Sequence, residues 1–100
     1  MRPIHLATLD KTRPVLVLTR EQVRPFLNSI TVAPITSTIR GLSTEVPVGR
    51  VNGLDQDSVI SCDSITTIPR GAIGRLLGYL HPTQEPLLAH AITAAYDLAV

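Results

Sequence analysis

Two short blocks in the first forty residues constrain the fold more than any other part of the sequence. Residues 11–19 read Lys-Thr-Arg-Pro-Val-Leu-Val-Leu-Thr, and residues 32–38 read Val-Ala-Pro-Ile-Thr-Ser-Thr. The apolar run 15–19 is nearly continuous, which is typical of a central strand covered on both faces. If the two strands are neighbours, the Arg13 guanidinium and the hydroxyls after the second strand meet at one sheet edge. Such a constellation suits a phosphodiester ligand.

The remaining pattern predicts a small curved sheet followed by one helix. Proline is tolerated at the first position of a strand, so Arg13-Pro14 opens one strand, and Pro34 is expected to end another. Thr83 is a candidate N-cap for the C-terminal helix, and Glu85 would lie in its first turn. An apolar stripe at helical spacing follows, made of Leu88, Ala91, Ile92, Ala95 and Leu98. The expected strands cover residues 4–9, 15–19, 29–33, 44–48, 58–61, 65–68 and 75–80, with an Asn-Gly turn at 52–53.

Length and residue content exclude several classes of protein. With 100 residues, the chain is expected to form a single domain over residues 1–100. Cys62 is the only cysteine, which excludes an internal disulfide and a thiolate metal cluster and favours a reducing cytoplasm. No apolar run approaches the ~18 residues of a membrane span, and no signal-peptide core is present. The carboxylates lack metal-ligand spacing, so neither a metal nor a cofactor is expected.

The basic residues favour a phosphate ligand, although the net charge is only +1. Eight of the nine are arginine, and Lys11 is the only lysine. The arginine fork binds phosphate bidentately and stacks on bases. A GC-rich genome is the alternative explanation for this usage. Hydrophobic residues make up 44% of the chain and charged ones only 17%, which fits either a subunit interface or an ordinary core.

Each candidate site residue also has a purely structural interpretation. Arg13 suits phosphate binding, but it also suits a surface ion pair with Asp10. The hydroxyls of residues 36–38 suit an anion cradle, but they also suit a turn that satisfies its own backbone. His5 would lie near Arg13 if the first two strands pair. His81 and His90 lie beside or within the helix, where neither is expected to act.

Taken in order, the blocks resemble the MazF/PemK family of toxin–antitoxin toxins. The sequence carries Arg-Pro-Val-Leu-Val at 13–17, Val-Ala-Pro-Ile-Thr-Ser at 32–37, Asp-Ser-Val-Ile at 57–60 and Gly-Tyr-Leu at 78–80, followed by the helix. The similarity runs from about Leu9 to Leu98. It implies a mainly β fold with a C-terminal α-helix, an SH3-like, partly open barrel of the MazF/CcdB type, assembled as a homodimer.

The resemblance also implies an activity and its residues. The molecule would be a metal-independent, sequence-specific endoribonuclease that cleaves single-stranded RNA, giving a 2′,3′-cyclic phosphate and a 5′-hydroxyl. Arg13 and Thr36 would be the catalytic pair, and His5, Asp10 or water would act as base. The expected RNA contacts are Lys11, Thr12, Ser37, Thr38, Arg40 and Ser58.

The expected partners are RNA (mRNA, rRNA or tRNA) and an acidic, partly disordered antitoxin that binds the same groove and forms a hetero-oligomer with the toxin. The arginine-rich connector 20–24 and Arg40 would lie at the groove rim. Two other classes stay open at this point. One is a non-enzymatic CcdB-like toxin that binds a protein such as gyrase. The other is an SH3-like binding module without activity.

Overall fold

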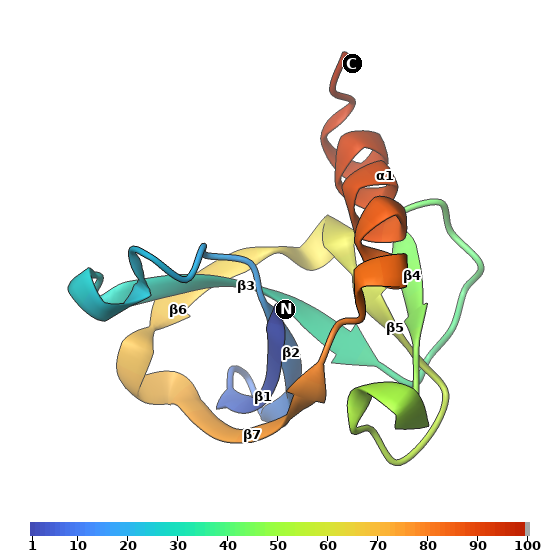
Figure 1. The fold of residues 1–100 in the computed structure, drawn as a ribbon. Helices are drawn as coiled ribbons and strands as arrows, with labels where there is room; N and C mark the ends of the chain where they lie inside the picture. The colour runs from blue at the N-terminus through green and yellow to red at the C-terminus, as the bar shows by residue number, and fades with distance from the viewer. Residues whose placement is uncertain (100) are drawn as a thin grey trace.

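A computed structural model describes residues 1–99, which form one curled antiparallel sheet with a helix at its C-terminal end (Figure 1). The strand order is β4-β5-β3-β2-β1-β7, and β6 pairs with a different part of β3. The predicted mainly β, partly open barrel with a C-terminal helix is therefore confirmed. The strands are β1 (Pro3–Thr8), β2 (Thr12–Val17), β3 (Ser29–Thr36), β4 (Glu45–Val48), β5 (Ser58–Ser61), β6 (Thr66–Pro69) and β7 (Ile73–Tyr79), and the helix is α1 (Glu85–Tyr96).

β3 is the strand that holds the two halves of the sheet together. One side pairs with β2, with Val15 opposite Pro34. The other side pairs with β6 up to Val32 and with β5 from Ile35 onward. The expectation that Pro34 ends this strand is wrong. Pro34 lies in the gap between the β6 and β5 pairings, where a missing backbone donor costs no ladder bond.

The predicted burial of β2 on both faces is confirmed. Val15 and Leu16 are fully buried, and Val17 is 3% exposed. Alternate side chains of β2 therefore enter two separate apolar cores. One core gathers Leu16 with Ile4, Ile60, Leu80 and the helix residues Leu88 and Ala91. The other gathers Val15 and Val17 with Ala7, Ile30, Val32 and Ile68.

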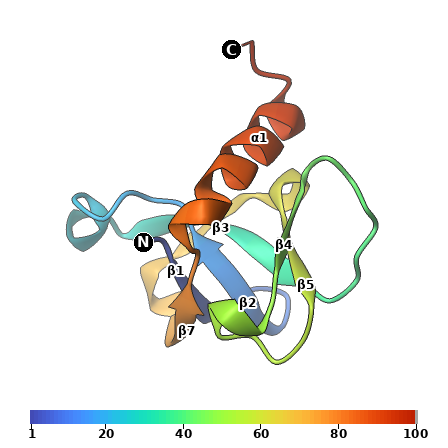
Figure 2. The same ribbon diagram turned by 45° about the vertical axis from the view of Figure 1, so that its right-hand side comes forward.

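The C-terminal helix is confirmed, but both of its ends differ from expectation. Gln84, not Thr83, is the N-cap residue, because Pro82–Gln84 forms a preceding 3-10 turn. Leu98 lies beyond the helix and is 54% exposed. α1 covers one end of the sheet, and its C-terminus points away from it (Figure 2). Among residues 1–99, neither the length nor the hydropathy of any helix reaches what a membrane crossing needs.

A buried asparagine joins three elements beneath the helix. Asn52 ends the 3-10 turn Arg50–Asn52, and Gly53 follows in the left-handed region with φ 87°. The Asn52 side chain accepts a hydrogen bond from the Gly49 N–H and donates to the Tyr79 carbonyl and to Gln84. The predicted Asn-Gly turn is present, with Asn52 fully buried. The hydrogen bonds of the Asn52 side chain thus connect the end of β4 with the end of β7 and the start of α1.

Candidate functional site

Arg13 lies at the start of β2 with a guanidinium that is only partly engaged. Its side chain is 25% exposed, and Nη2 donates to both carboxylate oxygens of Asp10, at 3.1 and 3.2 Å. Nε is buried and has no hydrogen-bond partner among residues 1–99. An unpaired buried donor is costly, and because Nε is shielded from solvent, a ligand would reach the guanidinium through its terminal nitrogens.

Thr36 lies at the end of β3, beside the start of β2. The register places Val15 opposite Pro34, and two further residues along each strand lead to Arg13 and Thr36. Thr36 Oγ1 accepts a hydrogen bond from the Thr38 N–H at 3.1 Å. The turn thus satisfies part of its own backbone, as the structural interpretation expects. The Thr36 hydroxyl hydrogen is free to donate to a ligand.

Two adjoining cavities open on either side of this pair, and Arg13 and Thr36 are the residues that line both. We call them the Lys11 cavity, of about 360 Å³, and the Arg40 cavity, of about 320 Å³. The Lys11 cavity is further lined by Leu6, Lys11, Thr12, Pro14, Ile35, Ser37, Leu54, Asp55, Gln56 and Ser58. The Arg40 cavity is further lined by Pro34, Thr38, Arg40, Leu42, Glu45, Ser61, Asp63 and Ser64.

The structure brings every residue predicted for RNA binding into one of the two cavities. Lys11, Thr12, Ser37 and Ser58 are in the Lys11 cavity, and Thr38 and Arg40 are in the Arg40 cavity. Ser58 is buried, and its hydroxyl donates to the Gln56 carbonyl at 3.1 Å. The exposed side chains of this set are therefore the better placed to contact a ligand.

Two carboxylates that no sequence motif marks also line the Arg40 cavity. Glu45 Oε1 accepts hydrogen bonds from the backbone N–H groups of Arg40 and Leu42, at 3.2 and 3.1 Å. Asp63 Oδ2 accepts from the Thr44 hydroxyl at 2.6 Å. Glu45 therefore fixes the loop that carries Arg40, and Thr44 fixes the Asp63 carboxylate. In the sequence, the one feature that marks Asp63 is its place just after the expected strand 58–61.

His5 does not join Arg13, although β1 and β2 do pair. Its Nδ1 lies 2.9 Å from the Gly74 carbonyl. The ring lines a different cavity, together with Arg24, Ile30 and Arg70. The expected proximity is wrong because β1 also pairs with β7, whose backbone binds the imidazole.

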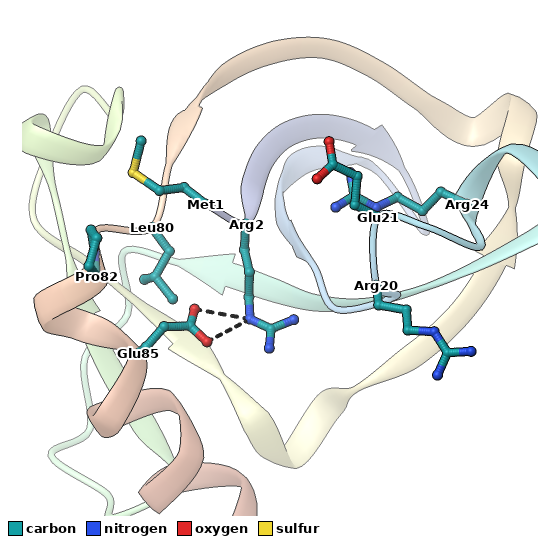
Figure 3. Close-up of a pocket in the computed structure, with 8 residues that line it drawn as sticks. All are labelled: Met1, Arg2, Arg20, Glu21, Arg24, Leu80, Pro82 and Glu85. Carbon is teal, nitrogen blue, oxygen red and sulfur yellow. Dashed lines mark hydrogen bonds and ion pairs between the residues drawn. The ribbon is translucent and has the colours of Figure 1, made fainter.

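The arginines of connector 20–24 also lie away from the Arg13–Thr36 pair in this chain. Arg20 and Arg24 line a cavity of about 380 Å³ beside Arg2 and Glu85 (Figure 3). Arg2 Nε donates to both Glu85 carboxylate oxygens, at 3.1 and 3.0 Å. The connector leaves β2 at the end opposite to Arg13, and a six-residue strand spans about 20 Å. Arg40, in contrast, does lie beside the pair.

Cys62 is not a nucleophile candidate. Burial, with a further contribution from the nearby Asp63 carboxylate, raises the pKa of its thiol to about 11. A thiol that stays protonated at neutral pH is inert. Among residues 1–99, no group of three or more His, Cys, Asp or Glu side chains is arranged to hold a metal ion.

Comparison with known proteins gives a consistent result. Residues 5–95 match the family described as PemK-like, MazF-like toxin of type II toxin–antitoxin system. The chain is 65% identical to Endoribonuclease MazF3 of Mycobacterium tuberculosis (strain ATCC 25618 / H37Rv) over 98 residues, covering 98% of this chain and 95% of the relative. Probable endoribonuclease MazF2 of the same strain is 39% identical, with 78% of each chain covered.

Solved structures agree with the sequence relatives. Mycobacterium tuberculosis toxin MazF-mt6 superposes with a TM-score of 0.97 at 64% identity, covering 99% of this chain and 100% of the other. An endoribonuclease in complex with its cognate antitoxin, from a mycobacterial species, superposes with a TM-score of 0.87. At 21% identity, over 98% of this chain and 94% of the other, that second match supports the fold alone.

Proposed function

We infer that this chain, because it belongs to the PemK-like and MazF-like family of toxins of type II toxin–antitoxin systems, is an endoribonuclease that stops growth by cutting RNA needed for translation. The relatives named endoribonuclease cover nearly the full chain at high identity. The observation that carries the site assignment is the position of Arg13 and Thr36, which line both adjoining cavities. A strand of RNA lying through both cavities would place a phosphate between them.

The chemistry needs little from the protein, because RNA carries its own nucleophile. The 2′-oxygen attacks phosphorus, the bond from phosphorus to the 5′-oxygen breaks, and the products are a 2′,3′-cyclic phosphate and a 5′-hydroxyl. The 2′-hydroxyl loses one proton, and the leaving oxygen gains one. The protein must align these atoms and stabilise the added charge on the phosphoryl oxygens.

Arg13 and Thr36 fit those two tasks. The Arg13 guanidinium, which is partly exposed, would donate to the nonbridging oxygens. The Thr36 hydroxyl would donate to the same phosphate. Arginine stays charged at any physiological pH, so its role is electrostatic and not proton transfer. The side chain of His5 lines neither cavity, whereas Asp10 contacts Arg13. Asp10 or water is therefore left to accept the 2′-hydroxyl proton.

Two partners follow from this assignment. The first is a cognate acidic antitoxin, whose carboxylates would occupy the same arginine-bearing groove as RNA and form a hetero-oligomer with the toxin. The second is another copy of the chain. Large apolar side chains are exposed, Phe26 at 84% and Val51 at 73% among them, and a symmetric dimer would cover part of this surface.

The test is cleavage of defined single-stranded RNA by purified protein in excess EDTA, followed on a denaturing gel. We expect cleavage without added metal, and we expect Arg13→Ala and Thr36→Ala each to slow it by about 10²–10³. Circular dichroism should show that both variants remain folded. Arg75→Ala, which removes an exposed arginine outside both cavities, is the matched control. Near-normal cleavage by folded Arg13→Ala would remove Arg13 from the mechanism.

The non-enzymatic alternatives are not favoured. A relative that covers 98% of the chain and a second that covers 78% carry endoribonuclease names, and the Arg13–Thr36 pair is intact. A CcdB-like toxin or a binding module would leave every RNA uncut in the same gel.

A further inference from the structure

The Arg40 cavity has an unusual charge arrangement for a site that binds RNA. Arg13 and Arg40 line it, but so do two carboxylates, Glu45 and Asp63. A carboxylate repels phosphate, so its presence weakens general RNA binding. The Glu45 carboxylate has a structural task, because one of its oxygens binds the backbone of Arg40 and Leu42. No backbone group in the described part of the chain gives Asp63 a comparable task.

Asp63 is nevertheless held firmly in place. Its backbone lies in the 3-10 turn Cys62–Ser64, which is anchored by the buried Cys62 side chain. The Cys62 N–H donates to the Thr44 carbonyl at 3.0 Å, and the Thr44 hydroxyl donates to Asp63 Oδ2 at 2.6 Å. Thr44 therefore binds both the backbone of this turn, at Cys62, and the side chain of Asp63. The bond uses Oδ2 and leaves the lone pairs of Oδ1 for a ligand in the cavity.

We propose that Asp63 is a specificity-determining residue that accepts a hydrogen bond from the exocyclic amino group of an RNA base in the Arg40 cavity. This inference rests on the proposed endoribonuclease function. Unstacked bases of single-stranded RNA are read by hydrogen bonds at their pairing edges. A carboxylate is the natural acceptor for an amino group such as cytosine N4. Uracil carries a carbonyl oxygen at the same position, which Asp63 repels.

The position read by Asp63 is next to the cut. Arg13 and Thr36, at the boundary of the cavity, would hold the cleaved phosphate, so the base in the Arg40 cavity belongs to one of the two nucleotides that flank it. Cytidine and uridine differ there mainly in the amino group and the carbonyl. They are therefore the matched pair that isolates this contact.

The experiment is cleavage of a randomised single-stranded RNA pool, with sequencing of the cut ends, by wild type, Asp63→Asn and Thr44→Val. Single-site cytidine and uridine substrates then give rates. For wild type we expect about tenfold faster cleavage with cytidine than with uridine at one flanking position. Asp63→Asn keeps an oxygen for Thr44 but presents an NH₂ group, so this ratio should fall to about one or reverse. Thr44→Val, which frees the carboxylate to rotate, should reduce the ratio while leaving cleavage measurable.

Asp97→Asn removes the same charge at the far end of the helix and should keep the wild-type ratio. A wild type that cuts none of the pool would overturn the proposed function itself. A wild type that cuts, with an Asp63→Asn variant that keeps the same base preference, would overturn only the role of Asp63. That role would also be overturned if Asp63→Asn were uniformly slower on all substrates, because a purely structural role predicts such a result.

Discussion

At the scale of single residues, the Arg13 guanidinium has a carboxylate partner before any substrate arrives. The Asp10 side chain is 74% exposed, and exposed ion pairs of this kind contribute only about 0–1 kcal/mol. A phosphate can therefore replace Asp10, or share the guanidinium with it, at little cost. The pair keeps the guanidinium in one orientation, with one of its two terminal nitrogens engaged by Asp10.

Because the pKa of the Cys62 thiol is raised on folding, Cys62 should make the free energy of unfolding depend on pH. The pKa of its thiol is about 11 in the folded protein and 9.0 in the unfolded chain, so the folded state keeps a proton that the unfolded state loses. The free energy of unfolding should therefore fall as pH rises from about 9 to about 11. Cys62→Ala lacks this contribution. Urea unfolding at several alkaline pH values should show a shallower decline for the variant, and parallel declines would contradict the assignment.

Sequence reasoning located some site residues and missed others for physical reasons. Arg13 and Thr36 were predictable because polar side chains at the ends of paired strands meet at a sheet edge. Asp63 is not predictable from a motif, because its placement depends on Thr44, which is distant in sequence. His5 was misplaced because its partner is a backbone carbonyl on β7, which no pattern in β1 reveals.

At the scale of elements, strands were easier to predict than their ends. Alternation and apolar runs located every strand, and the ends shifted by a few residues. The prediction that Pro34 ends its strand is wrong because a proline interrupts a strand only where its missing N–H would have paired, and neither β6 nor β5 pairs with β3 at that residue. The N-cap prediction at Thr83 is wrong because residues 82–84 form a 3-10 turn, in which Gln84 bonds to Asn52, 32 residues earlier in the chain. Local sequence contains neither fact.

The Asn52 junction should be essential for docking the helix. Asn52→Ala would leave the Gly49 N–H and the Tyr79 carbonyl without their partner, and it would open a buried polar space. We expect a loss of about 2–3 kcal/mol in the free energy of unfolding, measured by urea denaturation. Asn28→Ala, at an exposed position, is the matched control and should stay within about 0.5 kcal/mol of wild type. Equal effects of the two substitutions would show that the junction contributes nothing.

At the scale of the whole molecule, RNA and antitoxin should compete for one groove. The net charge is only +1, so attraction for polyanions must come from the local arginines and Lys11. We expect an acidic peptide of the cognate antitoxin to displace an uncleavable 2′-deoxy RNA in a fluorescence titration. Both affinities should fall steeply with added salt. A peptide with its acidic residues amidated is the control. Simultaneous binding with unchanged RNA affinity would mean that the two sites are separate.

The pairing of the first strand with the last has a consequence for the cell that makes this chain. β1 pairs with β7, with Pro3 opposite Tyr79, and the Arg40 cavity requires Ser61, Asp63 and Ser64. Contacts between such distant segments form only after the intervening chain is available. In a nascent copy, the sheet that carries the cutting groove is therefore complete only after β7 has left the ribosome. Each copy thus cannot cut RNA before its residues 3–79 have been made, and an antitoxin that binds the groove has no target on that copy before this point.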